Sequence, residues 1–473
     1  MESLLKSASE AATLILKNIQ ENRTIHVASH LDADGLAAAG IVGRALFRLG
    51  ATFRLRIERW LDEEIIHNLA NEKPPLTIFL DLGSGYLNLL SSGLSDYNIV
   101  ILDHHKPTGE ASETFTQVNP HLYGIDGALD LSGAGVAYLV ARALDKENRD
   151  LACLAVVGAL GDIQDKYDQR KLGGVNERIV KDAVDTGYVK VEEDLLFFGR
   201  ETRPIHRALA LTTNPFIPGI SGEEDKSLAF LANLKITPKD KDRWRALKDL
   251  SDEEKKRLFS ALAEYLASKG LATDVEKRLV GNVYTLTHEE ESTPLRDGRE
   301  FTVLLNATGR MDKAGLGAQI CLGDRGAALE EANTVLREYR RSIAKALNWL
   351  NEKPERIEEL GNIYVARGSG HIDDKMISAV STILSTSVAN LEKPIIAYCK
   401  IKGEDSAKIS ARTLDILTRR GLDLGEILRI AAERHSGMGG GHNIAAGGQV
   451  PVKDLEPFLK LVDKLVKEQL ARG

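Results

Sequence analysis

The first third of the chain alternates short apolar runs with longer stretches whose apolar residues recur at helical spacing. The runs TIHVASH, LTIFLDLGS and YNIVILDHH each end in polar residues, and GLAAAGIVGRALFRLG, SGAGVAYLVARAL and LACLAVVGALGD have a helical pattern. This alternation predicts an α/β fold with a parallel sheet between about residues 24 and 162. In such sheets ligands bind outside the carboxyl ends of the strands. The pattern places His30, Asp81 and Asp103 there.

The pattern changes near residue 219, where the chain becomes strongly charged. The stretch KITPKDKDRWRALKDLSDEEKKRLFSALAEYLASKG favours helices and offers no candidate catalytic group. We therefore expect a first domain over residues 1–218, interrupted by a helical insertion over 219–285. Residues 286–350 are expected to return to the first domain and to end in a connecting helix, ALEEANTVLREYRRSIAKALNWL.

Residues 351–473 predict a second, smaller α/β domain. NIYVARG, PIIAYCKI and SAKISART have the composition of strands, and LEPFLKLVDKLVKEQL is an amphipathic helix. Between them lies the glycine-rich run SGMGGGHNIAAGG. Its successive glycines would let backbone N–H groups approach a phosphate closely, or they would simply form a turn.

Composition narrows the class of protein. The 473 residues carry a formal net charge of −7, so nucleic acid would have to be bound through local basic patches and metal ions. No apolar run approaches the roughly 20 residues that a membrane span needs. The amphipathic N-terminus does not resemble a signal peptide, and we expect a cytoplasmic protein with no membrane partner. Three widely spaced cysteines argue against structural zinc or a disulfide framework.

Four segments carry the candidate chemistry, and together they bring eight acids and histidines. These are His30, Asp32 and Asp34 in SHLDADG, Asp81 in FLDLG, Asp103, His104 and His105 in LDHHKP, and Asp162 in GALGD. Each segment alone is a weak signal, since Asp34, for example, could simply cap the following helix. Together they predict two divalent cations about 3.5–4 Å apart, sharing a carboxylate. Mixed imidazole and carboxylate donors favour Mn²⁺, with Mg²⁺ as the alternative.

These motifs resemble a known family. HxDxDG, an isolated Asp, DHH and GxxGD, in this order, are similar to the four motifs of the DHH phosphoesterase superfamily. GGGHNIAAGG resembles the signature of the DHH-associated C-terminal domain, and LLNATGRMD resembles a stretch of RecJ-type single-strand nucleases. The helical insertion resembles that of the archaeal RecJ-like nucleases associated with the GINS replication complex. His30 departs from bacterial RecJ, which usually has an aspartate there, so the metal preference could differ.

The resemblance implies a role for each residue. One cation would be held by His30, Asp32 and Asp81, and the other by Asp34, Asp81, His104 and Asp162, with Asp81 as the bridge. Asp103 would orient an imidazole, and His105 would face the scissile phosphate. The substrate-binding candidates are Asn306, Arg310, Ser410, Arg412, Gly440, Gly441 and His442. Asn306 and Arg310 could instead support a turn, and Arg412 could form a surface ion pair.

The expected function is that of a metal-dependent exonuclease acting on single-stranded nucleic acid, DNA rather than RNA. A RecJ-like 5′–3′ polarity and a role in DNA replication or repair follow from the resemblance. Two alternatives stay open: a phosphodiesterase of dinucleotides or short RNA, and a non-catalytic replisome scaffold.

A partner is expected for the insertion. Leu247, Leu250, Leu258, Leu262 and Leu266 predict an amphipathic module, and a partly open apolar face would dock a GINS subunit. The alternative is that this face packs on its own domain.

Overall fold

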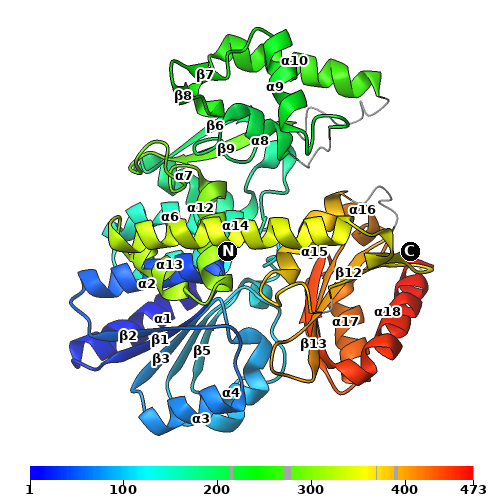
Figure 1. Ribbon diagram of the computed structural model, residues 1–473. Coiled ribbons are helices and arrows are strands. Elements are labelled where there is room, and N and C mark those ends of the chain that lie inside the picture. Colours follow the sequence, from blue (N-terminus) through cyan, green and yellow to red (C-terminus); the bar gives the residue numbers. More distant parts are fainter. Residues whose placement is uncertain (213–216, 270–278, 369, 388–392, 472–473) are drawn as a thin grey trace. The chain divides into compact units, whose positions relative to one another are not determined.

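The protein is described by a computed structural model over residues 1–212, 217–269, 279–368, 370–387 and 393–471. It divides into two compact units, Met1–Leu336 and Arg337–Gly473, and the division falls within a long helix, α14 (Ala327–Asn351). Each unit has its own sheet (Figure 1).

A five-stranded, fully parallel sheet organises the first unit (Figure 1). Its order is β2-β1-β3-β4-β5, with β1 (Ile25–His30), β2 (Phe53–Glu58), β3 (Leu76–Leu80), β4 (Ile99–Leu102) and β5 (Phe115–Val118). The α/β class with a parallel sheet is confirmed. The apolar runs in β1, β3 and β4 are almost completely buried, as strands covered on both faces must be.

Helices cover both faces of this sheet. The elements are α1 (Glu2–Gln20), α2 (Ala33–Arg48), α3 (Glu63–Glu72), α4 (Leu87–Leu94), α5 (Gly133–Leu144), α6 (Ala152–Gly161) and α7 (Gly174–Asp185). Because side chains alternate along a strand, Ala28, Phe79 and Ile101 lie on one face, where they join the core formed with α3 and α4. Helices α1, α2 and α5 contact the sheet as well, and α6 packs on α2 and α5.

The insertion leaves and returns through an antiparallel ribbon, β6 (Val189–Leu195) with β9 (Val280–Leu286). Between them lie α8 (Ile205–Ala210), α9 (Glu224–Asn233), the hairpin β7 (Lys239–Asp240) with β8 (Arg243–Trp244), and α10 (Asp252–Ser268). Helix was predicted for the hairpin segment, but its charged residues pair across a tight turn. Residues 270–278 of the predicted insertion lie outside the described ranges.

The prediction that the insertion leaves part of its apolar face open is wrong. All five leucines on which it was based are at most 5% exposed. They pack with Leu195, Ile205 and Leu231 in a core that the insertion forms by itself. The alternative, an apolar face turned inward on its own domain, is what the structure has.

After the insertion, the chain packs again on the helices of the parallel sheet through α12 (Gly298–Arg310) and α13 (Ala314–Leu322), both of which contact α2. The LLNATGR segment therefore forms the second half of α12. The long helix α14 follows, as predicted from its apolar spacing.

The second unit is a six-stranded mixed sheet in the order β10-β11-β12-β13-β15-β14. Its elements are β10 (Ile357–Glu359), β11 (Tyr364–Arg367), α15 (Ile377–Ser387), β12 (Ile395–Lys400), β13 (Ser406–Arg412), α16 (Asp415–Thr418), α17 (Leu424–Glu433), β14 (Met438–Gly441), β15 (Ala445–Pro451) and α18 (Leu455–Leu470). Strands β11, β12 and β13 and the last helix match the predicted segments, whereas β10, β14 and β15 were not predicted as strands. The glycine-rich run is a hairpin, and β14 is an edge strand.

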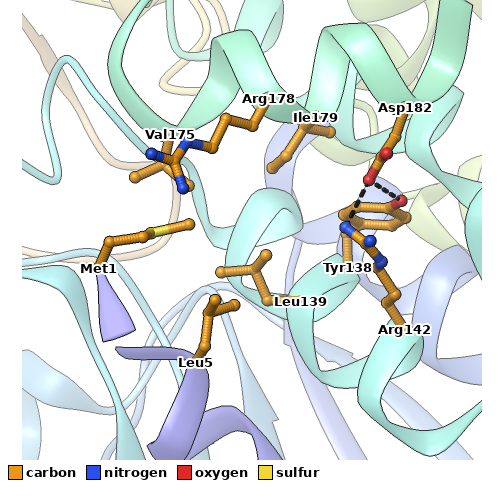
Figure 2. Close-up of a pocket in the computed structure, with 9 residues that line it drawn as sticks. All are labelled: Met1, Leu5, Tyr138, Leu139, Arg142, Val175, Arg178, Ile179 and Asp182. Carbon is orange, nitrogen blue, oxygen red and sulfur yellow. Dashed lines mark hydrogen bonds and ion pairs between the residues drawn. The ribbon is translucent and has the colours of Figure 1, made fainter. Parts of the chain in front are cut away.

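Among the described residues, no helix is both long and apolar enough to span a membrane. The three cysteines are free and buried. A pocket of the first unit lies among α1, α5 and α7 (Figure 2), where Asp182 accepts hydrogen bonds from Tyr138 (2.8 Å) and Arg142 (2.7 Å). Its lining is mostly apolar and contains none of the predicted site residues.

Candidate metal centre

The eight predicted acids and histidines all follow the carboxyl ends of strands or the end of one helix. His30 is the last residue of β1, and Asp81 follows β3 directly. Asp103, His104 and His105 follow β4, and Asp162 is the C-cap of α6. Asp32 and Asp34 lie at the start of α2. Neighbouring parallel strands bring these segments to one edge of the sheet.

One of the resulting clusters contains the three residues predicted for the first cation, and a second contains three of the four predicted for the other. His30, Asp32 and Asp81 place one donor atom each within 4.8 Å of one another, and so do Asp34, His104 and Asp162. In the first cluster, His30 Nδ1 lies 3.0 Å from Asp32 Oδ2 and 3.5 Å from Asp81 Oδ2. In the second, His104 Nε2 lies 3.7 Å from Asp34 Oδ2 and 3.1 Å from Asp162 Oδ2.

Asp81 lies between the two clusters. Its Oδ2 is the atom near His30, whereas its Oδ1 lies 3.2 Å from His104 Nε2. One carboxylate therefore offers a different oxygen to each side, which is the geometry that a bridging ligand requires. A third donor cluster, Asp81 with His104 and His105, extends the group towards the surface.

Some of the buried ligand atoms have no hydrogen bond, and a cation would satisfy them. Among the described residues, the buried atoms His30 Nδ1 and Asp81 Oδ1 have no hydrogen-bond partner of acceptable geometry, although charged neighbours are close. Buried polar atoms left in this way are rare unless an ion or another ligand satisfies them. Glycines allow the close packing: a Cβ on Gly158 would lie 2.3 Å from Asp34 Oδ1, and one on Gly133 would lie 2.7 Å from Asp81 Oδ1.

The DxD pair spans the start of α2. Asp32 is the N-cap of α2, with Oδ1 accepting from the Gly35 amide at 3.0 Å. Asp34 lies inside the first turn, and its carboxylate accepts from the amides of Gly133 (2.6 Å) and Ala134 (3.0 Å) at the start of α5. Asp32 therefore has the capping role that was considered for Asp34 in α2, and Asp34 instead caps the start of α5.

Crowding of like charges changes the pKa values of the buried acids. Burial, followed by the neighbouring Asp162 and Asp81, raises the pKa of Asp34 well above its usual range. Burial and Asp32 likewise raise the pKa of Asp81. A bound cation would relieve this repulsion and favour both ionised forms.

The same charges also raise the pKa values of the imidazoles, and for histidine a raised pKa favours the charged form. Burial acts to lower the pKa of His104, but the carboxylates of Asp162 and Asp81 outweigh it and raise that pKa well above 6.5. His30 behaves in the same way, with Asp32 as the main carboxylate that raises its pKa against burial. The cluster therefore attracts positive charge, whether a proton or a metal ion.

Asp103 orients His105, as predicted for it. Its Oδ1 accepts from His105 Nδ1 at 2.8 Å and from the His104 amide at 2.8 Å, and its Oδ2 accepts from the Ser84 amide at 2.8 Å. Burial raises the pKa of Asp103, but His105 and these donors lower it below its usual range. The His105 side chain is 41% exposed, so it can reach a bound substrate.

A buried chain of amides, which was not predicted, holds His104. His104 Nδ1 lies 2.6 Å from the Gly127 carbonyl oxygen, which also accepts from Gln164 Nε2 at 2.9 Å. Gln164 Oε1 in turn accepts from Asn176 Nδ2 at 2.6 Å. A proton fixed on Nδ1 leaves Nε2 as the ligand atom. Only the two-residue distance of Gln164 from Asp162 could have suggested this role.

The α12 candidates differ from one another. Asn306 Oδ1 accepts from the Ala33 amide at 3.1 Å and therefore supports the turn between Asp32 and Asp34. This is the structural role that was the alternative to a nucleic-acid contact. Arg310 is the last residue of α12 and is partly exposed, which is compatible with either role.

The second unit places its candidates on β13 and in the glycine-rich hairpin. Arg412 donates to Thr382 Oγ1 at 3.0 Å and lies 3.4 Å from Ser410 Oγ. Ser410 is 1% exposed and pairs with Ser381 Oγ at 2.8 Å, so it supports Arg412 and offers no surface to a phosphate. The phosphate contact predicted for Ser410 stays a prediction.

The hairpin candidates are accessible. Gly440 and Gly441 lie on the edge strand β14, and a Cβ on Gly440 would meet nothing within 4 Å. Half-buried His442 occupies the turn, with its amide donating to the Ala445 carbonyl at 2.8 Å. An open backbone edge next to a histidine is compatible with the predicted phosphate contact.

The sequence of this chain is similar to those of known families and proteins. The DHH-CID domain family matches residues 197–280, and the DHHA1 domain family matches residues 362–468. An uncharacterized protein of Methanocaldococcus jannaschii is 34% identical over 479 residues, covering 100% of both chains. The single-stranded-DNA-specific exonuclease RecJ of Thermus thermophilus is 29% identical over 194 residues, which are 38% of this chain and 28% of RecJ.

Solved structures share the fold. The crystal structure of Thermus thermophilus RecJ in complex with Mn²⁺ has a TM-score of 0.60 at 20% identity and covers 98% of this chain but 55% of RecJ. CDC45 from Entamoeba histolytica has a TM-score of 0.66 at 12% identity, covering 98% of this chain and 99% of that one. The chain thus spans about half the length of the RecJ structure and the whole of CDC45.

Proposed function

Because the chain belongs to the DHH superfamily of phosphoesterases and has a RecJ-like architecture, we propose that it is an exonuclease that hydrolyses single-stranded nucleic acid with two divalent cations. The observation that carries the proposal is the position of Asp81, with one carboxylate oxygen near each of two donor clusters. A single metal needs no such sharing, whereas two-metal phosphodiester hydrolysis does.

His30, Asp32 and Asp81 would hold one cation, and Asp34, Asp81, His104 and Asp162 the other. Bound there, the cations would supply an activated water and neutralise charge on the phosphate. We propose Mn²⁺ over Mg²⁺, because each set contains an imidazole nitrogen and Mg²⁺ prefers an all-oxygen shell.

His105 is proposed to face the scissile phosphate. Asp103 fixes its Nδ1, which leaves Nε2 of a partly exposed ring to donate to a phosphate or leaving oxygen. Burial lowers the pKa of His105, but the neighbouring Asp103 outweighs it and raises that pKa, which favours the charged, donating form.

We propose DNA as the substrate, with 5′–3′ polarity and a role in replication or repair, by analogy with the RecJ relative. The test is incubation with end-labelled single-stranded DNA, single-stranded RNA and a dinucleotide, each with Mn²⁺ or Mg²⁺. Stepwise shortening of the DNA strand in Mn²⁺ is expected. Cleavage of the dinucleotide alone would favour the small-substrate alternative, and no hydrolysis of any substrate would favour the scaffold.

Asp81→Asn is the sharpest variant for this assay. It removes the bridging charge but keeps the volume, and asparagine tolerates the positive φ of 54° at this position. Activity should fall at least tenfold and Mn²⁺ binding should weaken, whereas Asp96→Asn, at an exposed aspartate, should change neither. Asp81→Asn activity close to wild type would rule out the bridging role.

Docking of a GINS subunit on the insertion is retained as a proposal, but it must use surface residues, since the leucines are buried. Replacing the whole segment between β6 and β9, residues 196–279, with a Gly/Ser bridge should abolish capture of purified GINS and spare hydrolysis of short strands, because the ribbon of β6 and β9 stays intact. Capture equal to that of the full chain would disprove this docking site.

A further inference from the structure

An exposed tryptophan lies at the same sheet edge as the metal-ligand candidates. The parallel register of β1 and β2 pairs His30 with Glu58, the last residue of β2. Trp60 follows two residues later and is 46% exposed. A large aromatic side chain therefore lies in solvent immediately beyond the strand end next to His30.

The ring of Trp60 is fixed in place, although much of it is exposed. Its Nε1 donates to Asp62 Oδ2 at 3.3 Å, and Asp62 is itself held as the N-cap of α3 by the Ile65 amide at 2.9 Å. The indole has no other polar atom. What remains exposed is an apolar aromatic surface with a set orientation.

A cation lies beside this ring. The Arg59 guanidinium carbon is 5.6 Å from the ring centroid of Trp60, within the usual range for a cation–π contact. Arg59 Nη2 also lies 3.6 Å from Asp312 Oδ1, in the loop that follows the LLNATGR segment of α12. Aromatic surface and positive charge are therefore adjacent at the edge of the centre.

We propose that Trp60 is a stacking platform for a nucleobase next to the scissile phosphate, with Arg59 favouring the adjacent backbone charge. The inference rests on the proposed function and specifies how that site holds a single strand. Unpaired bases stack on aromatic side chains with little sequence preference, because every base has a π-face. Bases in a duplex already stack on one another, so the platform would favour single strands.

The test is a double-mutant cycle between ring and base. Wild type, Trp60→Ala and Trp60→Phe are compared on a short single strand with all its bases and on the same strand lacking one base at the cleavage position. Affinity is measured by fluorescence anisotropy in EDTA, and KM and kcat are measured in Mn²⁺. Trp244→Ala is the matched control, since Trp244 is 40% exposed and lies in the insertion.

On the complete strand, Trp60→Ala should weaken affinity and raise KM by about tenfold, a typical effect for one stacked base. Trp60→Phe should retain most of the affinity, and Trp244→Ala should change nothing. On the strand that lacks the base, Trp60→Ala should have no further effect. An equal loss on both strands, or none on either, would overturn the platform while leaving the proposed function in place. A wild type that neither binds nor cleaves single strands would overturn the proposed function itself.

Discussion

At the scale of single residues, hydrogen bonds within the protein hold the side chains of the site in position. Asp103 uses both oxygens to accept from backbone amides and His105, and His104 binds the Gly127 carbonyl through Nδ1, which leaves Nε2 for a ligand. Asp81 is the exception, since its Oδ1 is buried without a hydrogen bond. The neighbours thereby fix ligand geometry before any cation binds, which lowers the cost of ordering the site.

The amide chain behind His104 gives a prediction at this scale. Gln164→Ala removes one donor to the Gly127 carbonyl and leaves Asn176 Nδ2 without its acceptor. Looser control of the imidazole should weaken Mn²⁺ binding by about 10- to 100-fold, the usual effect of losing such support. Electron paramagnetic resonance titration of free Mn²⁺ measures this directly.

The matched control is Asn148→Ala, which removes a buried amide whose side chain binds the Ala141 carbonyl, away from the centre. Both variants should lower the melting temperature, but Asn148→Ala should leave Mn²⁺ affinity unchanged. If the two variants bind Mn²⁺ equally well, Gln164 is merely structural.

At the scale of elements, sequence pattern succeeds where burial is continuous and fails where it is partial. Strands β1, β3 and β4 are uninterrupted apolar runs and were predicted, as were α2, α5 and α6. Strand β2 was missed although FRLRIE alternates apolar with charged residues, as a half-buried edge strand does, and β5 was missed because FTQV is short and polar. The sequence pattern does not show which helix or strand packs over a residue in the folded protein.

The same limit applies to the site. The eight acids and histidines could be selected because each motif pairs a strand or helix end with metal-binding residue types. Gln164 and Asn176 could not, since their roles depend on a carbonyl 37 residues from Gln164 in the chain. The leucines of α10 show the converse error, because a helical apolar face is compatible with either a partner or an internal core.

The insertion contains an ion pair with a predictable pH dependence. Arg245 donates to both oxygens of Glu254, at 2.9 and 2.6 Å, and joins the hairpin β7–β8 to the start of α10. These bonds lower the pKa of Glu254 from 4.5 to about 2, against the effect of burial. A lowered carboxyl pKa stabilises the fold above pH 4.5, and the stabilisation disappears as the pH falls towards 2.

Glu254→Gln should therefore cost about 2 kcal/mol of stability at pH 7, a usual value for hydrogen bonds to a charged group. The difference in melting temperature from wild type should shrink steadily below pH 4.5. Glu253→Gln, at the exposed neighbouring position, provides the control and should show little difference at any pH. A wild-type advantage that stays constant down to pH 3 would contradict the ion-pair explanation.

At the scale of the whole molecule, the metal-ligand candidates lie in one unit and the accessible phosphate-contact candidates Arg412 and His442 in the other. This division predicts separable kinetic effects. Arg412→Ala should raise KM severalfold with little change in kcat, because it removes a contact made throughout the reaction. Asp81→Asn should instead reduce kcat. Steady-state kinetics on a single-stranded oligonucleotide distinguish the two.

Arg429→Ala is the control in the second unit, because Arg429 forms only an exposed pair with Glu433 within α17. It should leave both constants unchanged. A lower kcat for Arg412→Ala at unchanged KM would place that side chain in the chemical step and contradict the division of labour.

The hydrogen bonds between Asp34 and the start of α5 affect what a conserved aspartate at this position says about catalysis in a related protein. The carboxylate is fully buried and accepts two backbone amides, so a descendant that had abandoned hydrolysis would still need an acceptor there to fold. An aspartate conserved at this position therefore does not show that the protein is catalytically active. The residue equivalent to Asp81 is more informative, because its buried Oδ1 accepts no hydrogen bond and lies 3.2 Å from another ligand candidate, His104 Nε2. Drift should erase that residue first once selection for catalysis ends.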